Sequence, residues 1–216
     1  MIVGFLSADL SRWDQLLRER GAWPSCIGLP FFEDERPLRG AAGLCDWRLG
    51  GRISRLLGAR IGSQRDDRGE SIKLSGSFGE KLLLPTGPRL PFGRLVLLGL
   101  GSSKLFDEAR AQTASRELLK TLHALAEKHE DGRTHLAIVP PGRSTGALSS
   151  RRALEILLEE AEASPKSSSN MRITVIESVA GQKEAAELAR RFAVVSSGHP
   201  SSADARSGDV GDGSPV

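Results

Sequence analysis

The sequence has no tyrosine and only two cysteines, Cys26 and Cys45, among its 216 residues. Both cysteines stand in apolar or small-residue stretches, which argues against a disulfide framework and fits a reducing, cytoplasmic location. No apolar run reaches the length of about 18 residues typical of a membrane-spanning helix, and the start MIVGFLSADL lacks the basic region of a signal peptide. We therefore expect a cytoplasmic protein with no membrane partner.

Aromatic residues are scarce, at 5% of the chain, and the excess of basic over acidic residues is small, 30 against 27. The two signs of charge are mixed along the chain, so no single basic block marks a nucleic-acid site. Few aromatic rings are available for stacking on bases. Composition therefore gives only weak support for a nucleic-acid partner.

Histidine is also rare, and the four histidines form no recognisable metal site. His123 and Glu127 are four residues apart on a predicted helix, but no second ligand pair accompanies them. His129, His135 and His199 stand in no ligand or base pattern. We expect neither a metal nor a cofactor.

No nucleophile pattern is complete either. Cys45, beside Asp46 and Trp47, is interpreted as a buried small apolar residue rather than a reactive thiolate. The serine-rich segments contain no Gly-x-Ser-x-Gly motif. We expect no catalytic residues.

Short apolar runs alternate with amphipathic stretches over residues 1–195. Strands are expected at 1–6, 26–32, 80–85, 93–100, 134–141 and 171–178, and helices at 11–20, 44–57, 106–128, 148–163 and 181–195. The second strand is expected to close at Pro30 or at the charged turn EDERP. This alternation predicts a layered α/β fold with a mainly parallel or mixed sheet and helices on both faces.

Two segments fall outside this alternation. Residues 60–79, rich in glycine, serine and charge, are predicted to form an exposed loop. Residues 196–216 have almost no large apolar side chain, so we expect a disordered polar tail after a single domain of residues 1–195.

The stretch RLVLLGLGSS, residues 94–103, joins a predicted strand to a predicted helix through two glycines. A dinucleotide fingerprint requires a third glycine where Lys104 stands, and a Walker loop requires Gly-Lys-Ser/Thr. A tight turn is the favoured interpretation. If the turn holds a ligand, the candidate residues are at the end of the strand: Gly99, Gly101, Ser102 and Ser103.

The order of segments resembles a known domain. LGGRISRLL (49–57), followed by GEKLLLPTGPRLPFGRLVLLGLGSSKLFDEARAQTASRELLKTL (79–122), is similar to the N-terminal domain of the metal-dependent leucyl aminopeptidase family. The resemblance extends over about residues 1–195 and is strongest over 43–125. It implies a macro-like, three-layer α/β fold without catalytic function, since the family's metal-binding half has no counterpart here.

Three functions are compatible with that resemblance. The first is a stand-alone, non-catalytic module for protein interaction or assembly, whose partner is a catalytic aminopeptidase or a second copy of the chain. The second is a module that binds a nucleotide, ADP-ribose or nucleic acid. The third is an accessory subunit of a split aminopeptidase. Each is an expectation for the structure to test.

Overall fold

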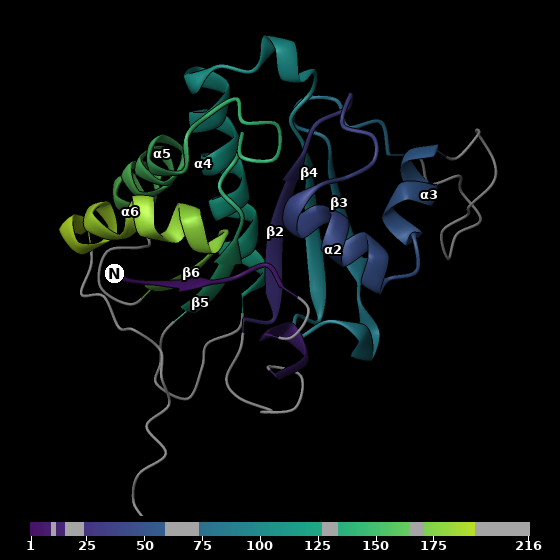
Figure 1. Ribbon diagram of the computed structural model, residues 1–216, viewed down its shortest axis with the longest axis horizontal. Helices are drawn as coiled ribbons and strands as arrows, with labels where there is room; N and C mark the ends of the chain where they lie inside the picture. The colour runs from purple at the N-terminus through teal and green to yellow at the C-terminus, as the bar shows by residue number, and fades with distance from the viewer. Residues whose placement is uncertain (10–11, 16–23, 59–73, 127–133, 165–170, 193–216) are drawn as a thin grey trace, which may run out of the picture.

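The computed structural model describes residues 1–9, 12–15, 24–58, 74–126, 134–164 and 171–192. Its strands are β1 (Ile2–Leu6), β2 (Cys26–Phe31), β3 (Lys81–Pro85), β4 (Arg94–Gly99), β5 (Thr134–Ile138) and β6 (Met171–Ile176). Its helices are α2 (Gly40–Arg48), α3 (Arg52–Gly58), α4 (Glu108–Leu125), α5 (Ser150–Ala163) and α6 (Val179–Phe192), with short 3-10 turns η1 (Gly87–Arg89) and η2 (Ser103–Leu105). From β4 to α6, strands and helices alternate along the chain (Figure 1).

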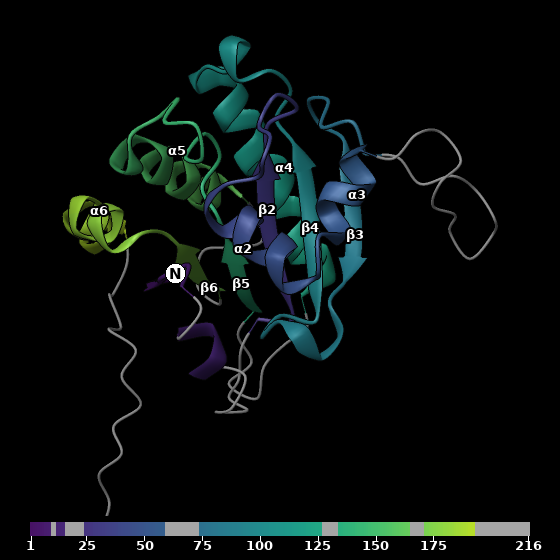
Figure 2. The ribbon, with the colours of Figure 1, turned by 45° about the vertical axis from the view of Figure 1, so that its right-hand side comes forward.

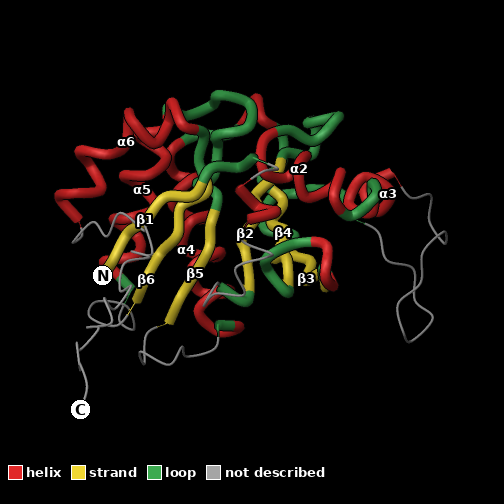
Figure 3. Tube along the Cα trace, turned by 60° about the horizontal axis from the view of Figure 1, so that its bottom comes forward, coloured by secondary structure: helices red, strands yellow, loops and turns green. Residues whose placement is uncertain are grey.

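The described strands form one six-stranded sheet in the order β1-β6-β5-β2-β4-β3 (Figure 3). Neighbouring strands run parallel from β1 through β4. The edge strand β3 is antiparallel to β4, because the turn that contains η1 folds it back as a hairpin. The mixed, mainly parallel sheet is confirmed.

Alternate residues of the strands face two separate cores. On β4, Leu95 and Leu97 pack into the core beneath α2 and α3, whereas Val96 and Leu98 pack into the core beneath α4, α5 and α6. Successive strand residues point to opposite faces, so a sheet covered on both sides needs the continuous apolar run that β4 supplies. Figure 2 shows α2 and α3 on one face of the sheet and α4 on the other. The three-layer α/β fold is therefore confirmed.

The helix expected at 44–57 is instead two helices. α2 ends at Arg48, and α3 begins at Arg52 after a turn at Gly50 and Gly51, both of which have positive φ. A left-handed backbone conformation at two successive residues cannot continue a right-handed helix. The apolar spacing of residues 49–57 continues across this break. Leu49 lies in the turn and packs into the same core as α2 and α3.

Helix starts agree with simple capping chemistry. The Asp107 carboxylate accepts a hydrogen bond from the backbone N–H of Arg110 at 2.9 Å and begins α4. The Ser149 hydroxyl accepts one from the N–H of Arg152 at 3.2 Å and begins α5. Such caps satisfy amide groups that have no partner within the helix.

Several expectations concern residues outside the described part of the chain. Of the helix expected at 11–20, residues 12–15 are helical and the others lie outside it. The tail at 196–216 and most of the loop at 60–79 also lie outside it. Within the described helices, none is both long and apolar enough to cross a membrane.

Candidate functional site

Two neighbouring strands part at the carboxyl end of the sheet. β2 and β5 pair at Ile27 with Ala137 and at Gly28 with Ile138, and a last backbone bond joins Val139 N–H to the Gly28 carbonyl at 3.0 Å. The next β2 residue that could face β5 is Pro30, which has no N–H to donate. A cavity of about 280 Å³ opens there, lined by Pro30, Val139 and Pro140 among others.

Chain topology explains why the cavity lies between these two strands. From β2 the chain passes through α2 and α3 and returns at β3 and β4, on one side of β2. From β4 it passes through α4 and returns at β5, on the other side of β2. In open α/β sheets, ligands bind outside the carboxyl ends of the strands at such a reversal of strand order.

The N-terminus of α2 forms one wall of the cavity. Gly40, Ala41 and Ala42 line it, and the first backbone bond of the helix is from Gly43 N–H to the Arg39 carbonyl. Amide groups of a first helical turn have no intrahelical acceptor and carry the positive end of the helix dipole. Arg39 also lines the cavity and is exposed. No described carboxylate forms an ion pair with its side chain. This wall therefore favours an anion.

An ion pair also lines the cavity. Arg143 Nε donates to Glu177 Oε2 at 2.7 Å, and the Ser178 N–H donates to Glu177 Oε1 at 2.8 Å. Burial would raise the pKa of Glu177, but the hydrogen bonds from Arg143 and Ser178 outweigh it, so the pKa is lowered. Glu177 is thus ionised at neutral pH, and its charge balances that of Arg143.

A second contact ties the loop after β5 to the loop after β2. The Ser144 hydroxyl donates to Glu35 Oε2 at 2.6 Å, and the Arg39 N–H donates to Glu35 Oε1 at 3.0 Å. Glu35 is 5% exposed, so these bonds satisfy a buried carboxylate. They hold the entrance to α2 and the 142–144 loop in fixed positions on two sides of the cavity.

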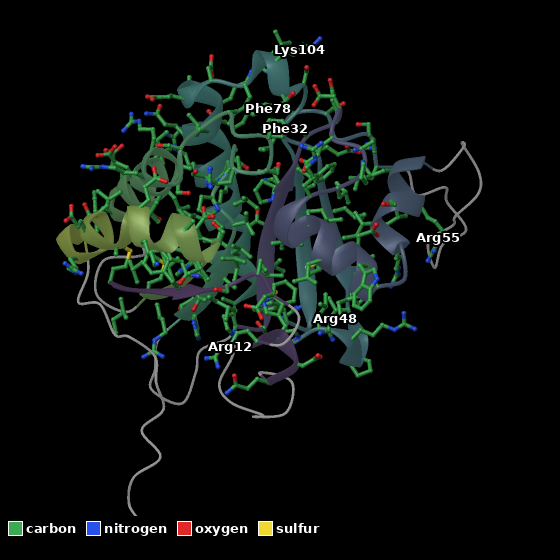
Figure 4. The ribbon with its side chains drawn as sticks, viewed as in Figure 1. Arg12, Phe32, Arg48, Arg55, Phe78 and Lys104 are labelled. Atoms are coloured by element: carbon green, nitrogen blue, oxygen red, sulfur yellow. The ribbon has the colours of Figure 1, made fainter. Side chains whose placement is uncertain are left out.

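The four residues predicted to bind a ligand lie at the end of β4, beside the cavity rather than in its wall. Leu100, between Gly99 and Gly101, lines the cavity. Backbone amides of this turn donate within the protein: Gly99 N–H to the Glu80 carbonyl at 2.8 Å, and Gly101 N–H to the Gly76 carbonyl at 2.9 Å. Figure 4 shows Phe32, Phe78 and Lys104 gathered at this end of the sheet.

The serines of the turn are occupied too. The Ser103 N–H and hydroxyl donate to the Asp34 carboxylate at 3.0 and 2.8 Å, and the Ser102 hydroxyl donates to it at 3.3 Å. Burial acts to raise the pKa of Asp34, but these hydrogen bonds prevail and lower it. The described contacts therefore favour a structural turn, and ligand binding by Gly99, Gly101, Ser102 and Ser103 stays a prediction.

The remaining candidate residues are dispersed. His135 is buried, with its Nε2 2.8 Å from Thr174 Oγ1. Burial, together with the nearby Asp46 carboxylate, raises the pKa of the Cys45 thiol, which is therefore protonated at neutral pH. Glu127, His129 and His199 lie outside the described residues. Within the described ranges, no three His, Cys, Asp or Glu side chains are grouped to hold a metal ion.

Sequence comparison and structure comparison give different results. No family model and no curated protein matches the sequence. Solved structures do match: a mutant macrodomain of Oceanobacillus iheyensis with ADPR has a TM-score of 0.53 at 12% identity, covering 88% of this chain and 91% of that one. The macrodomain of Mycobacterium tuberculosis DarG has a TM-score of 0.51 at 15% identity, covering 82% and 98%. A Trypanosoma brucei macrodomain in complex with ADP has 0.53 at 13%, covering 86% and 66%.

The chain has the macrodomain fold. The predicted relationship to the leucyl aminopeptidase N-terminal domain is wrong, since the similar structures are macrodomains. The two segments that suggested it have structural roles that a layered α/β fold can require in any family. LGGRISRLL contains the turn between two helices, and GLGSS contains a close backbone approach at the end of a strand. The comparisons also give no support to a protein partner.

Five residues that build the cavity belong to no motif recognised in the sequence: Arg39, Gly40, Ala41, Arg143 and Glu177. Arg39, Arg143 and Glu177 lie in the loops that follow parallel strands, and Gly40 and Ala41 begin α2. A usable signal was Pro30 inside the apolar run CIGLPF, because a proline there interrupts the pairing of a central strand.

Proposed function

We propose that the protein binds a nucleotide with a diphosphate group, of the ADP-ribose class, in the cavity between β2 and β5. The observation that carries the proposal is the N-terminus of α2, together with Arg39, facing that cavity. Helix N-termini bind phosphate through backbone amides and the helix dipole. Two of the similar structures hold ADPR and ADP, which agrees with this chemistry.

The charges of the cavity support a diphosphate over a neutral ligand. Arg143 is balanced by Glu177, whereas Arg39 has no described carboxylate partner. The helix terminus adds a partial positive charge of about half a unit. The diphosphate would therefore lie against α2, with Gly142 and Ser144 of the opposite loop across the cavity.

A second, more open cavity offers room for the nucleoside. Its volume is about 470 Å³, and its lining is mostly polar: Ser7, Asp9, Arg12, Gln15 and Gln182, with Phe5 and Leu6. Ala8 lines the first cavity, so the two cavities flank the same short segment after β1. The Asp9 Oδ1 accepts a hydrogen bond from the Arg12 N–H at 2.7 Å, and carboxylate oxygens can accept more than one, as from a base amino group or a ribose hydroxyl.

Binding without turnover is the activity we propose. Among the described residues, Glu177 is the carboxylate that lines the first cavity, and both its oxygens accept hydrogen bonds from Arg143 or Ser178. A carboxylate held in this way is a weak general base, because its lowered pKa reduces its affinity for a proton. We therefore expect the protein to bind the ligand without hydrolysing it.

Calorimetric titration tests the ligand class. We expect ADP-ribose and ADP to bind, and adenosine, which has no phosphate, to bind much more weakly. Arg39→Ala should weaken ADP-ribose binding about tenfold, the effect of losing one charge-assisted hydrogen bond. Lys120→Ala removes the same charge from the exposed face of α4 and should leave affinity unchanged.

Two results would count against the proposal. Equal binding of adenosine and ADP-ribose would show that phosphate is not recognised. Equal losses in Arg39→Ala and Lys120→Ala would show a general charge effect rather than a site at α2.

The absence of turnover is a separate expectation. ADP-ribose incubated overnight with the protein should be recovered intact by ion-exchange chromatography. Conversion to new products, lost in Glu177→Gln, would assign that carboxylate a catalytic role instead.

A further inference from the structure

Four exposed side chains surround the turn between α2 and α3, at the end of α2 remote from the cavity. They are Trp47, Arg52, Arg55 and Arg89, and we call this group the α2–α3 corner. Trp47 is 67% exposed, more than any other large apolar side chain among the described residues. Figure 4 shows Arg55 projecting from α3 on the outer side of the molecule.

Contacts with Gly50 place three of these residues together. The Gly50 N–H donates to the Trp47 carbonyl at 3.0 Å, and Arg55 Nη1 donates to the Gly50 carbonyl at 2.6 Å. Arg89 Nη1 lies 3.5 Å from the point where a Gly50 Cβ would stand. Two guanidinium groups and the residue that carries the indole thus meet at one backbone position.

The fourth residue reaches the same region from α3. Arg52 Nη1 donates to the Pro85 carbonyl at 3.3 Å, at the end of the edge strand β3. The next turn of the chain carries Arg89, on η1. The corner therefore groups guanidinium side chains from α3 and η1 beside the turn that follows the exposed Trp47 at the end of α2.

The positive charge of the corner is uncompensated within the described structure. Arg52, Arg55 and Arg89 form no ion pair with any described carboxylate. The acidic residue nearest in sequence, Asp46, accepts hydrogen bonds from the N–H groups of Ile53 and Ser54 at 2.8 and 3.0 Å. That carboxylate is held at the start of α3, and among the described residues no carboxylate neutralises the three guanidinium groups, whose donors bond only to backbone carbonyls where a bond is formed.

We propose that the α2–α3 corner binds single-stranded nucleic acid, with the guanidinium groups on phosphates and the Trp47 indole stacked on a base. Guanidinium groups match phosphate geometry with paired hydrogen bonds. An exposed indole offers a face on which any unpaired base can stack, and such stacking tolerates different sequences. A duplex hides its base faces, and an acidic polypeptide has no base to stack, so neither uses the indole in this way.

The corner is distinct from the nucleotide cavity. α2 has nine residues, and a helix rises about 1.5 Å per residue, so its two ends are separated by about 13 Å. The cavity lies at the N-terminal end and the corner at the C-terminal end. Failure of either proposal leaves the other standing.

Fluorescence anisotropy with a labelled 15-nucleotide single strand of mixed sequence, as DNA and as RNA, tests the proposal. At low salt we expect binding that weakens as salt is raised, because phosphate contacts release counterions. Trp47→Ala should weaken binding about tenfold, and Trp47→Phe, which keeps a ring, should recover most of that loss. Arg55→Ala and Arg89→Ala should each weaken binding severalfold and reduce its salt dependence.

Matched controls make the outcome decisive. Arg151→Ala removes an exposed arginine from α5, in the opposite layer, and should leave affinity unchanged. Saturating ADP-ribose and the Arg39→Ala variant should also have no effect. Circular dichroism melts of each variant verify the fold.

Three outcomes would overturn the proposal. The first is no binding at low salt. The second is equal losses for Arg151→Ala and Arg55→Ala. The third is competition by poly-glutamate or duplex as strong as that by unlabelled single strand, together with unchanged affinity in Trp47→Ala. That third result would assign the corner to general anion or protein contacts.

Discussion

Gly99→Ala is expected to destabilise the protein by about 3 kcal/mol or more, at the upper end of the usual effects of overpacking. A Cβ on Gly99 would stand 2.3 Å from the Ser77 carbonyl oxygen and 2.6 Å from the carbonyl atoms of Gly76. These are backbone atoms, and hydrogen bonds hold both carbonyls: Gly101 N–H donates to the Gly76 carbonyl at 2.9 Å, and Glu80 N–H donates to the Ser77 carbonyl at 3.0 Å. The Gly76 and Ser77 backbone therefore cannot move away from an added Cβ without breaking these hydrogen bonds.

Gly101→Ala is the matched comparison. Gly101 has a φ of 70°, and its added Cβ would meet nothing closer than 3.4 Å. Strain alone should then cost about 1 kcal/mol. Thermal unfolding followed by circular dichroism should rank the wild type above Gly101→Ala and Gly101→Ala above Gly99→Ala, with the larger drop roughly 6–12 °C.

The reverse ranking would contradict this account of the turn. A different result, in which both variants stay stable but ADP-ribose binding is lost, would restore the turn to the ligand site. The comparison therefore also decides the prediction that Gly99, Gly101, Ser102 and Ser103 bind a ligand.

The parts of the fold predictable from sequence are those with local causes. The apolar run of β4 and the Asp107 cap of α4 are visible in a few consecutive residues. The break between α2 and α3 was not, since apolar spacing continues through Gly50 and only backbone conformation shows that the helix ends there. Sequence order alone also suggested the wrong family, because different families share the constraints of one layered fold.

The candidate site was less accessible to sequence analysis, because its residues come together only through topology. Arg39 and Arg143 are more than a hundred residues apart in sequence, and they line one cavity because β2 and β5 are neighbours in the sheet. Each of the two residues, taken alone, resembles an ordinary surface arginine. The Glu35–Ser144 bond, which fixes the two loops relative to each other, likewise follows no local pattern.

Arg143→Met is expected to destabilise the protein by about 3 kcal/mol at pH 7, because removing one member of a buried ion pair leaves the other charge unpaired. Glu177 is 8% exposed, and Arg143 Nε is its 2.7 Å partner. The variant also loses the bond from Arg143 Nη1 to the Leu148 carbonyl at 2.9 Å. Glu177→Gln added to Arg143→Met should recover part of the loss, since it removes the unpaired charge.

The pH dependence of the unfolding free energy tests whether the unpaired Glu177 carboxylate causes the loss of stability in Arg143→Met. In the wild type, its pKa is lowered on folding, so its contribution to stability is present above the ordinary glutamate pKa and is lost as pH falls through the lowered value. Without Arg143, only the Ser178 hydrogen bonds oppose the effect of burial, so we expect the pKa of Glu177 to be higher than in the wild type and the variant to lose less stability as pH falls. The difference in unfolding free energy between wild type and Arg143→Met should therefore shrink between pH 7 and pH 4. Urea unfolding of both proteins at each pH measures it, and comparing the two cancels the titration of other acids. A difference that stays constant over this range would mean that the loss comes from the Leu148 contact and packing rather than from an unpaired Glu177 carboxylate.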